Sequence, residues 1–402
     1  MKKLKKTLSL FLTVCMLVGS ISVTAFADEP QAENITSENN DTSKKVQTES
    51  DAQTENTTSA DNDASGNMQT EPDAQAEGEN EADVAPQSTT AVNGYDYSIT
   101  MVDCGRKYYS VESLKSIIDS SSEAGMHYVM LAVGNDGLRF LLDDMSLEVN
   151  GKSYTSKQVS TGIHNGNVAY NSQTDQKELT ESDMNTIMAY AYTKGVEIIP
   201  LINTPGHMDA IITCMKELGM TKVTYSTSKR TIDVTNSEAV AFTQALLQKY
   251  ITYFASKGCT LFNMGADEYG NDVNGKPHFS DLQANGGEKY KKYIEYLNAV
   301  AKKIENAGMK PMAFNDGIYY NSNTSYGKID SNIIVCYWSA GWPGYDVASA
   351  SFLSQQGFKL INTHGDYYWI VGGTKVTESK AKQFNINSFY GDATISNPVG
   401  AM

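Results

Sequence analysis

Two adjacent carboxylates, Asp267 and Glu268, are the strongest chemical signal in the sequence. They follow the short apolar stretch 261–266, which is typical of a buried strand. Buried carboxylates are costly unless they are paired or used in chemistry. If both crowd one site, one is expected to keep its proton near neutral pH and to act as an acid. The alternative is a helix N-terminus, where acidic side chains interact favourably with the helix dipole.

Three further residue types could serve the same chemistry. His207 follows Pro205-Gly206, a pair that favours a tight turn after a strand and would hold the imidazole on rigid backbone. Arg106 could bind hydroxyl groups with its fixed fork of donors, although a surface ion pair is the alternative. Trp338 and Trp369 could form flat apolar walls for the face of a sugar ring, or could belong to the core.

Apolar stretches and helical patterns alternate along the chain and would position these residues. Strands are expected at residues 97–103, 127–133, 196–202, 261–266, 310–314, 333–338 and 358–361, with an eighth starting near Val399. Helices are expected at residues 111–124, 180–194, 208–218, 237–256 and 288–307, and a small hairpin at 145–155. This alternation predicts parallel β/α units.

The fold class is therefore α/β, and a (β/α)8 TIM barrel is favoured over a doubly wound open sheet. Polar residues fall just after the expected strands, and a barrel gathers such strand ends into one mouth. An open sheet would spread them along an edge. The residues concerned are Arg106, Asp136, His207, Asp267, Asp316, Trp338 and Asp366.

The N-terminal part is expected to lie outside the fold. Residues 1–27 have four lysines, an apolar run and an Ala25-Phe26-Ala27 cleavage site, which predict a secretory signal peptide. The apolar run is shorter than the roughly 20 residues of a spanning helix, so no membrane span is expected in the mature chain. Residues 28–92 are polar, acidic and partly repetitive, which predicts a disordered low-complexity linker. The barrel is assigned to residues 93–402.

Charge and cysteine content narrow the class of protein. The chain carries a formal net charge of −15. Residues 28–92 contain 16 acidic residues and 2 lysines, a net of −14, and the four lysines of residues 1–27 add +4, so residues 93–402 carry about −5. No basic stripe indicates a nucleic-acid partner. The four cysteines outside the leader show no C-x-x-C spacing and are expected to be buried thiols: Cys104, Cys214, Cys259 and Cys336.

Several motifs in residues 95–402 resemble the catalytic barrel of glycoside hydrolase family 20, the β-N-acetylhexosaminidases, and especially the catalytic domains of streptococcal surface exo-β-N-acetylglucosaminidase. The specific pair is the Pro205-Gly206-His207 turn followed by Gly265-Ala266-Asp267-Glu268-Tyr269. The resemblance is also carried by Cys104-Gly105-Arg106-Lys107-Tyr108, Gly134-Asn135-Asp136-Gly137-Leu138-Arg139-Phe140, Met312-Ala313-Phe314-Asn315-Asp316-Gly317, Tyr337-Trp338-Ser339 and Asn362-Thr363-His364-Gly365-Asp366-Tyr367-Tyr368.

The resemblance implies a substrate-assisted retaining mechanism, an exception to the scheme with two enzyme carboxylates. It implies that Glu268 is the general acid, and that Asp267 binds the acetamido N–H of the substrate while the acetamido oxygen attacks the anomeric carbon. The other implied catalytic residues are His207, backed by Asp136 or Asn135, and Tyr368, with Tyr367 as the alternative. The implied substrate-binding residues are Arg106, Asp136, Asn203, Asp316, Trp338, Trp369 and Tyr367.

The expected function is that of a secreted or cell-surface exo-β-N-acetylglucosaminidase acting on glycans with terminal β-linked GlcNAc. Neither a metal nor an organic cofactor is expected. A lacto-N-biosidase, or an inactive sugar-binding surface module, is the alternative. The sequence departs from the family pattern in two places: Asn263 replaces a frequent His, and the chain ends at the start of the eighth strand. We therefore expect a C-terminally incomplete barrel with unpaired edges.

Overall fold

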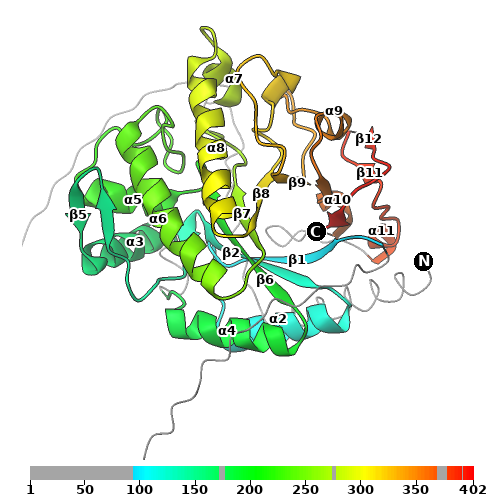
Figure 1. Cartoon of the computed structure of the whole chain (residues 1–402), viewed down its shortest axis with the longest axis horizontal. Helices are drawn as coiled ribbons and strands as arrows, with labels where there is room; N and C mark the ends of the chain where they lie inside the picture. The colour runs from blue at the N-terminus through cyan, green and yellow to red at the C-terminus, as the bar shows by residue number, and fades with distance from the viewer. Residues whose placement is uncertain (1–93, 172–176, 274–277, 369–377, 392) are drawn as a thin grey trace, which may run out of the picture. The chain divides into compact units, whose positions relative to one another are not determined.

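The computed structural model describes residues 94–171, 177–273, 278–368, 378–391 and 393–402. The expected signal peptide and linker, and Trp369, lie outside these residues. The barrel strands are β1 (Tyr97–Asp103), β2 (Tyr128–Asn135), β6 (Glu197–Thr204), β7 (Leu261–Gly265), β8 (Lys310–Phe314), β9 (Ile334–Tyr337), β10 (Leu360–Asn362) and β13 (Gly400–Ala401). All eight are joined edge to edge by parallel pairing, so the prediction of a TIM barrel is confirmed (Figure 1).

The expectation of an unclosed barrel is wrong. Strand β13 is only two residues long, yet it pairs with β1 on one side and β10 on the other. Gly400 lies opposite both Tyr97 and Ile361 in the register of the three strands. The backbone N–H of Tyr97 donates to Val399 at 3.0 Å, and that of Met402 donates to Asn362, also at 3.0 Å. These backbone hydrogen bonds remove the free edges.

Helices cover the outside of the barrel within the described residues. They are α2 (Val111–Glu123), α3 (Ser156–Tyr170), α4 (Glu181–Thr193), α5 (Asp209–Glu217), α6 (Ser237–Ser256), α7 (His278–Gln283), α8 (Glu288–Asn306), α9 (Ala350–Gln355), α10 (Gly365–Tyr368) and α11 (Glu378–Ala381). Figure 1 shows α2 and α4 side by side along the barrel, where they contact each other. None of the described helices is long and apolar enough to cross a membrane.

Local sequence signals account for most of these elements. Thr180 caps α4 with a reciprocal pair of hydrogen bonds to Asp183, as the S/T-x-x-D/E pattern predicts. The expected hairpin forms from β4 (Leu147–Val149) and β5 (Lys152–Tyr154). Smaller pieces are β3 (Gly137–Leu138), β11 (Ser388–Phe389), β12 (Ala393–Thr394) and a 3-10 turn at Tyr320–Ser322.

Two layers of apolar side chains hold the barrel together. The interior is filled by alternate residues of the strands, including Met130, Leu201, Met312 and Ile361, so it is a packed core. A larger layer fills the space between the strands and the helices. The four cysteines are buried and unpaired, as expected: Cys104, Cys214, Cys259 and Cys336.

Candidate active site

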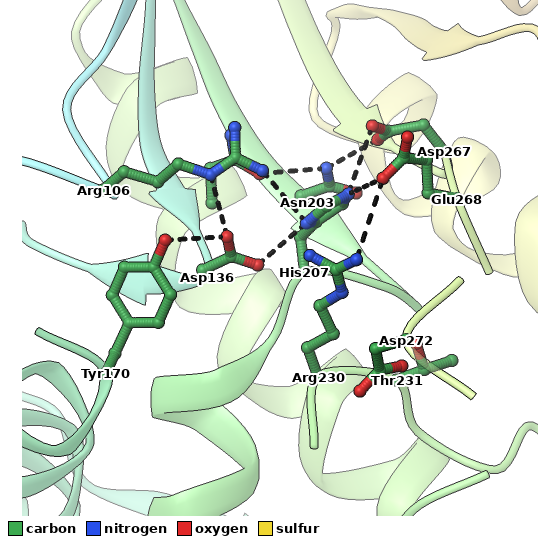
Figure 2. A network of polar contacts seen from close by, with 12 residues as sticks. Arg106, Asp136, Tyr170, Asn203, His207, Arg230, Thr231, Asp267, Glu268 and Asp272 are labelled. Carbon is green, nitrogen blue, oxygen red and sulfur yellow. Dashed lines mark hydrogen bonds and ion pairs between the residues drawn. The ribbon is translucent and has the colours of Figure 1, made fainter. Parts of the chain in front are cut away.

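The carboxyl ends of neighbouring strands carry the polar residues that the sequence singled out. Asp136 follows β2, His207 follows β6, Asp267 and Glu268 follow β7, and Asp316 follows β8. Because parallel strands of a barrel end at the same face, these side chains meet at one mouth. Figure 2 shows the resulting network of contacts around His207.

The loops that carry these residues have unusual backbone conformations. Four residues with a Cβ atom adopt the left-handed region: φ is 59° at Asp136, 52° at His207, 70° at Ala266 and 48° at Glu268. The Thr204–Pro205 peptide bond is cis. Such conformations are uncommon outside glycine and cluster at functional sites. They turn the chain sharply at the strand ends, so that the side chains face the mouth.

His207 lies at the centre of the cluster and is almost fully buried. Its Nδ1 is 2.8 Å from Oδ1 of Asp136, and its Nε2 is 3.5 Å from Asp267 Oδ2 and 3.4 Å from Glu268 Oε2. Burial disfavours the charged ring, but the carboxylates of Asp267, Asp136 and Glu268 outweigh it and raise the pKa of His207 well above its usual value. The ring is therefore an imidazolium at neutral pH, with both nitrogens donating.

Asp136, and not Asn135, is the residue that contacts His207. Burial alone would raise the pKa of Asp136, but its hydrogen bonds and ion pairs with His207 and Arg106 lower that pKa below the usual range. Asn135 instead donates to Asp103 at 2.9 Å. Of the two candidates that the sequence left open, Asp136 is the one placed against His207, and its supporting role stays a prediction.

Asp267 is held in place from two sides. Asn203 Nδ2 donates to Asp267 Oδ1 at 2.6 Å, and His207 approaches the other oxygen. Asn203 Oδ1 also accepts from the backbone N–H of Ala266 at 3.1 Å, which ties the amide to the β7 loop. Although burial acts in the opposite direction, the neighbouring imidazolium lowers the pKa of Asp267, so the side chain is a carboxylate at neutral pH.

Asp316 supports the other carboxylate of the pair. Its Oδ2 accepts from the backbone N–H of Glu268 at 3.0 Å and from the Tyr345 hydroxyl at 3.2 Å, while Trp338 Nε1 donates to Oδ1. Burial and the nearby charges of Asp267 and Glu268 raise the pKa of Asp316 well above its usual value. Through these hydrogen bonds Asp316 ties the loop that carries Glu268 to the Trp338 ring.

Arg106 lies on one side of the cluster and is 42% exposed. Its Nε donates to Asp136 at 2.8 Å and its Nη1 to Asp103 at 3.1 Å. Tyr170 donates to the same Asp136 carboxylate at 3.1 Å. The guanidinium is therefore oriented by two carboxylates and still reaches solvent, so it can meet a polar ligand at the mouth.

The residues expected from the segment after β10 are only partly described. The Tyr367 ring packs edge-on against His364, with centroids 4.7 Å apart, and also contacts Phe384. Tyr368 is the last residue of α10, but its side chain, like Trp369, lies outside the described residues. The choice between Tyr367 and Tyr368 stays a prediction. No three histidine, cysteine or acidic side chains gather as metal ligands within the described part of the chain.

Four polar residues of the site were not expected from the sequence. Asp103 and Tyr170 orient Arg106 and Asp136, Tyr345 binds Asp316, and Arg230 Nη2 lies 3.9 Å from Glu268 Oε2. Asp103 ends β1, so its place at a strand end was an available signal. Tyr170 lies on α3, and Tyr345 and Arg230 lie on loops. No sequence pattern identifies these three positions as part of the site.

The arrangement can move protons and stabilise positive charge. Two carboxylates stand side by side against one imidazolium, and both are about one-fifth exposed or less, at 16% and 21%. A partly desolvated carboxyl next to a charged ring suits general acid–base catalysis. A carboxylate held by an amide can bind an N–H or a developing cation.

Comparisons with known proteins agree with this geometry. The sequence profile described as "Glycosyl hydrolase family 20, catalytic domain" matches residues 95–395. A solved structure of the pneumococcal virulence factor StrH is 38% identical, with a TM-score of 0.71, and the match covers 77% of this chain and 78% of that one. A structure from the tandem GH20 catalytic modules of the pneumococcal exo-β-D-N-acetylglucosaminidase StrH is also 38% identical, with a TM-score of 0.70 and coverage of 76% of each chain.

A curated relative is more distant. A lacto-N-biosidase of Bifidobacterium bifidum is 27% identical over 218 residues, which are 52% of this chain and 18% of that protein. The chain thus spans less than a fifth of that relative. With a family profile that matches most of the chain, and with StrH modules similar over three-quarters of it, the chain belongs to glycosyl hydrolase family 20 and is a glycosidase.

Proposed function

We propose that the protein is a secreted exo-β-N-acetylglucosaminidase, which removes terminal β-linked GlcNAc from glycans by substrate-assisted retaining catalysis. The observation that carries the proposal is the shared contact of Asp267 and Glu268 with one His207 nitrogen, at 3.5 and 3.4 Å. The two carboxylates belong to consecutive residues at the end of β7 and face the same ring nitrogen. Retaining enzymes that use a carboxylate nucleophile instead place their carboxyl groups about 5–5.5 Å apart on either side of the sugar.

In the proposed first step, the carbonyl oxygen of the substrate's acetamido group attacks the anomeric carbon. Glu268 transfers its proton to the glycosidic oxygen as the bond to the leaving group breaks. An oxazolinium ion is formed, and its positive charge is shared between the ring nitrogen and carbon. In the second step Glu268, now a carboxylate, takes a proton from a water molecule as the water oxygen bonds to the anomeric carbon. The bond from that carbon to the acetamido oxygen breaks, which restores the acetamido group and gives overall retention.

Asp267 is proposed to bind the acetamido N–H and to stabilise the oxazolinium. Its carboxylate state, supported by the imidazolium of His207, suits this role because the charge it meets develops during the reaction. Asn203 fixes one of its oxygens through the 2.6 Å hydrogen bond, so the carboxylate is oriented before the substrate binds.

The remaining residues are proposed to bind the sugar or to position the acid pair. His207, backed by Asp136, would hold Asp267 and Glu268 together, and Arg106 would bind hydroxyl groups of the terminal sugar. Asp316 would fix Trp338 as a wall of the acetamido pocket. Tyr368, or Tyr367, would donate to the acetamido oxygen, and Trp369 would contact the sugar face.

One alternative substrate has an observation in its favour. The similarity to a lacto-N-biosidase suggests the same mechanism with a disaccharide as the released unit. The exposed Arg106 would then meet the second sugar rather than the floor of a closed pocket. Comparing GlcNAc and disaccharide glycosides with the same aryl leaving group decides between the two.

Export is part of the proposal and rests on the sequence alone. Residues 1–27 would be cleaved as a signal peptide, and residues 28–92 would act as an acidic linker before the barrel. N-terminal sequencing of the protein from culture medium tests this part separately from the activity.

The function is tested with a protein spanning residues 28–402 and an aryl β-GlcNAc substrate. We expect turnover, initial release of the β-anomer, and inhibition by a thiazoline that mimics the oxazolinium. Glu268→Gln should lose turnover of substrates with poor leaving groups, because no proton donor remains. Glu295→Gln, which changes an exposed acid on α8, is the matched control and should behave as the wild type. Release of the α-anomer, or full activity of Glu268→Gln, would contradict the mechanism.

A further inference from the structure

Arg230 is a second arginine at the mouth, on a different loop from Arg106. Its Nη2 lies 3.9 Å from Glu268 Oε2, and its side chain is 25% exposed. Figure 2 shows the guanidinium pointing toward Glu268, with Arg106 at the other end of the drawn network. The Nε of Arg230 is buried and has no hydrogen-bond partner among the residues that the structure describes.

The loop that carries Arg230 is clamped to the loop that carries the carboxylates. Asp272 accepts from the Ser228 hydroxyl at 2.6 Å and from the Lys229 backbone N–H at 2.7 Å. The backbone N–H of Gly270 donates to Thr231 Oγ1 at 3.0 Å. These hydrogen bonds lie on both sides of Arg230, so its backbone is fixed relative to Glu268.

The same loop also contacts the turn after β6. The backbone N–H of Met208, next to His207, donates to the carbonyl of Arg230 at 2.8 Å. The backbone around Arg230 is thus held by the loop after β7 and by the turn after β6, both of which carry residues of the site.

The position of Arg230 follows from the role of Glu268. A general acid must come within hydrogen-bond distance of the oxygen that it protonates. A donor 3.9 Å from the Glu268 carboxyl therefore lies next to the leaving group as well. A sugar leaving group carries hydroxyl groups close to the carbon that bears the glycosidic oxygen, and a guanidinium offers a planar fork of donors to such oxygens.

We propose that Arg230 is a specificity-determining residue that hydrogen-bonds the hydroxyl groups of the leaving-group sugar. This inference rests on the proposed function of Glu268 as the proton donor. Arg106 and Arg230 would then bind opposite sides of the scissile bond, the first the terminal sugar and the second the sugar that departs. The ligand class is a glycan whose penultimate sugar has a free hydroxyl next to the linkage.

The experiment compares Arg230→Met with the wild type on three β-GlcNAc substrates. The first is a disaccharide with a sugar leaving group. The second is cyclohexyl β-GlcNAc, whose leaving group needs protonation but has no hydroxyl groups. The third is a nitrophenyl glycoside, which leaves with little help from an acid. Lys229→Met removes the neighbouring charge on the same loop, where the side chain is exposed, and serves as the control.

We expect kcat/KM to fall about 10- to 100-fold on the disaccharide, as for the loss of a hydrogen bond to a charged group. The other two substrates should lose less than about threefold. Arg230→Lys should give an intermediate loss, because an ammonium keeps the charge but not the fork.

Equal losses on the disaccharide and the cyclohexyl glycoside would overturn the inference, because Arg230 would then act only through Glu268. Equal losses on all three substrates would assign it a structural role and would overturn the inference too. A wild type that fails on the nitrophenyl glycoside would reject the proposed function itself, and the inference with it. If the wild type is active on the nitrophenyl glycoside, and Arg230→Met has the same kcat/KM as the wild type on the disaccharide, only the inference is rejected and the proposed function stands.

Discussion

Replacing Asp267 with Asn is the sharpest test of the proposed chemistry. The substitution keeps the size of the side chain but exchanges one oxygen for an NH2 group. Asn203 donates to Oδ1 of Asp267, so the amide of the variant would keep its carbonyl oxygen on that side. Its NH2 group would then face His207 Nε2, itself a donor, and the acetamido N–H of the substrate.

The expected loss follows from two contributions. A hydrogen bond to a charged group is worth about 1.5–3 kcal/mol. Attraction between a carboxylate and a cation at about 4 Å is worth about 4 kcal/mol at an effective dielectric constant near 20. The two describe overlapping parts of one contact, so we take about 3–4 kcal/mol for the whole. This corresponds to a decrease in kcat of about 10²- to 10³-fold.

The assay is kcat on an aryl β-GlcNAc, together with the inhibition constant of a thiazoline. Both should worsen in Asp267→Asn, because the carboxylate contacts the intermediate more strongly than the substrate. Circular dichroism during thermal unfolding confirms that the variant folds. If Asp267→Asn keeps kcat within about threefold of the wild type, the substrate-assisted assignment is wrong.

Two further predictions concern stability. Burial, with the nearby Asp136 charge, raises the pKa of Asp209 to about 6. Because this value lies above the unfolded one of 3.8, folded wild type binds an extra proton between about pH 4 and 6, and its stability falls as the pH rises through that range. The free energy of unfolding of the wild type should therefore be lower at pH 7 than at pH 4, by at most about 3 kcal/mol from this group. Asp209→Asn should remove that difference in urea unfolding, and a variant with the same pH dependence as the wild type would refute the prediction. At the barrel seam, a Cβ at Gly400 would lie 2.1 Å from the Tyr97 carbonyl oxygen. Gly400→Val should therefore lower the free energy of unfolding by about 1–3 kcal/mol or more in the same assay. If the variant is as stable as the wild type, strands β1 and β13 can move apart enough to accept a side chain, and the prediction is wrong.

Much of the barrel was predictable because its strands carry a strong local signal. The boundaries of β1 and β8, and of α6, match the expected ranges. Buried parallel strands are short apolar runs, and the polar residues after them mark the mouth. For the same reason the sequence identified His207 and the carboxylates Asp267 and Glu268 as neighbours.

The closing of the barrel was not predictable from the length of the last apolar stretch. Strand β13 contributes two residues, fewer than a pattern of alternation needs to be recognised. Its pairing depends on β1 and β10, which are distant in sequence and already fixed by the rest of the barrel. Tertiary context, rather than local propensity, decides such an element.

Helix α3 was missed for a different reason. Its sequence contains glycines and many polar residues, which lower helix propensity. In the structure, Gly166 lets α3 lie against α5, since a Cβ there would come within 2.5 Å of the Cα of Ala210. Arg230 was missed for a similar reason, because its position beside Glu268 depends on tertiary contacts of its loop. The Lys229 backbone N–H donates to Asp272, and the Gly270 backbone N–H donates to Thr231.

The left-handed backbone at the rim has a consequence for transplanting this chemistry. Each such residue with a Cβ costs about 1–3 kcal/mol, and four of them surround the mouth: Asp136, His207, Ala266 and Glu268. Their sum is comparable with the whole stability of a domain, about 5–15 kcal/mol. An excised loop would relax to ordinary conformations. Copying the Asp-Glu pair and the histidine to another scaffold would therefore transfer the side chains but not their directions, unless the new scaffold imposed the same turns.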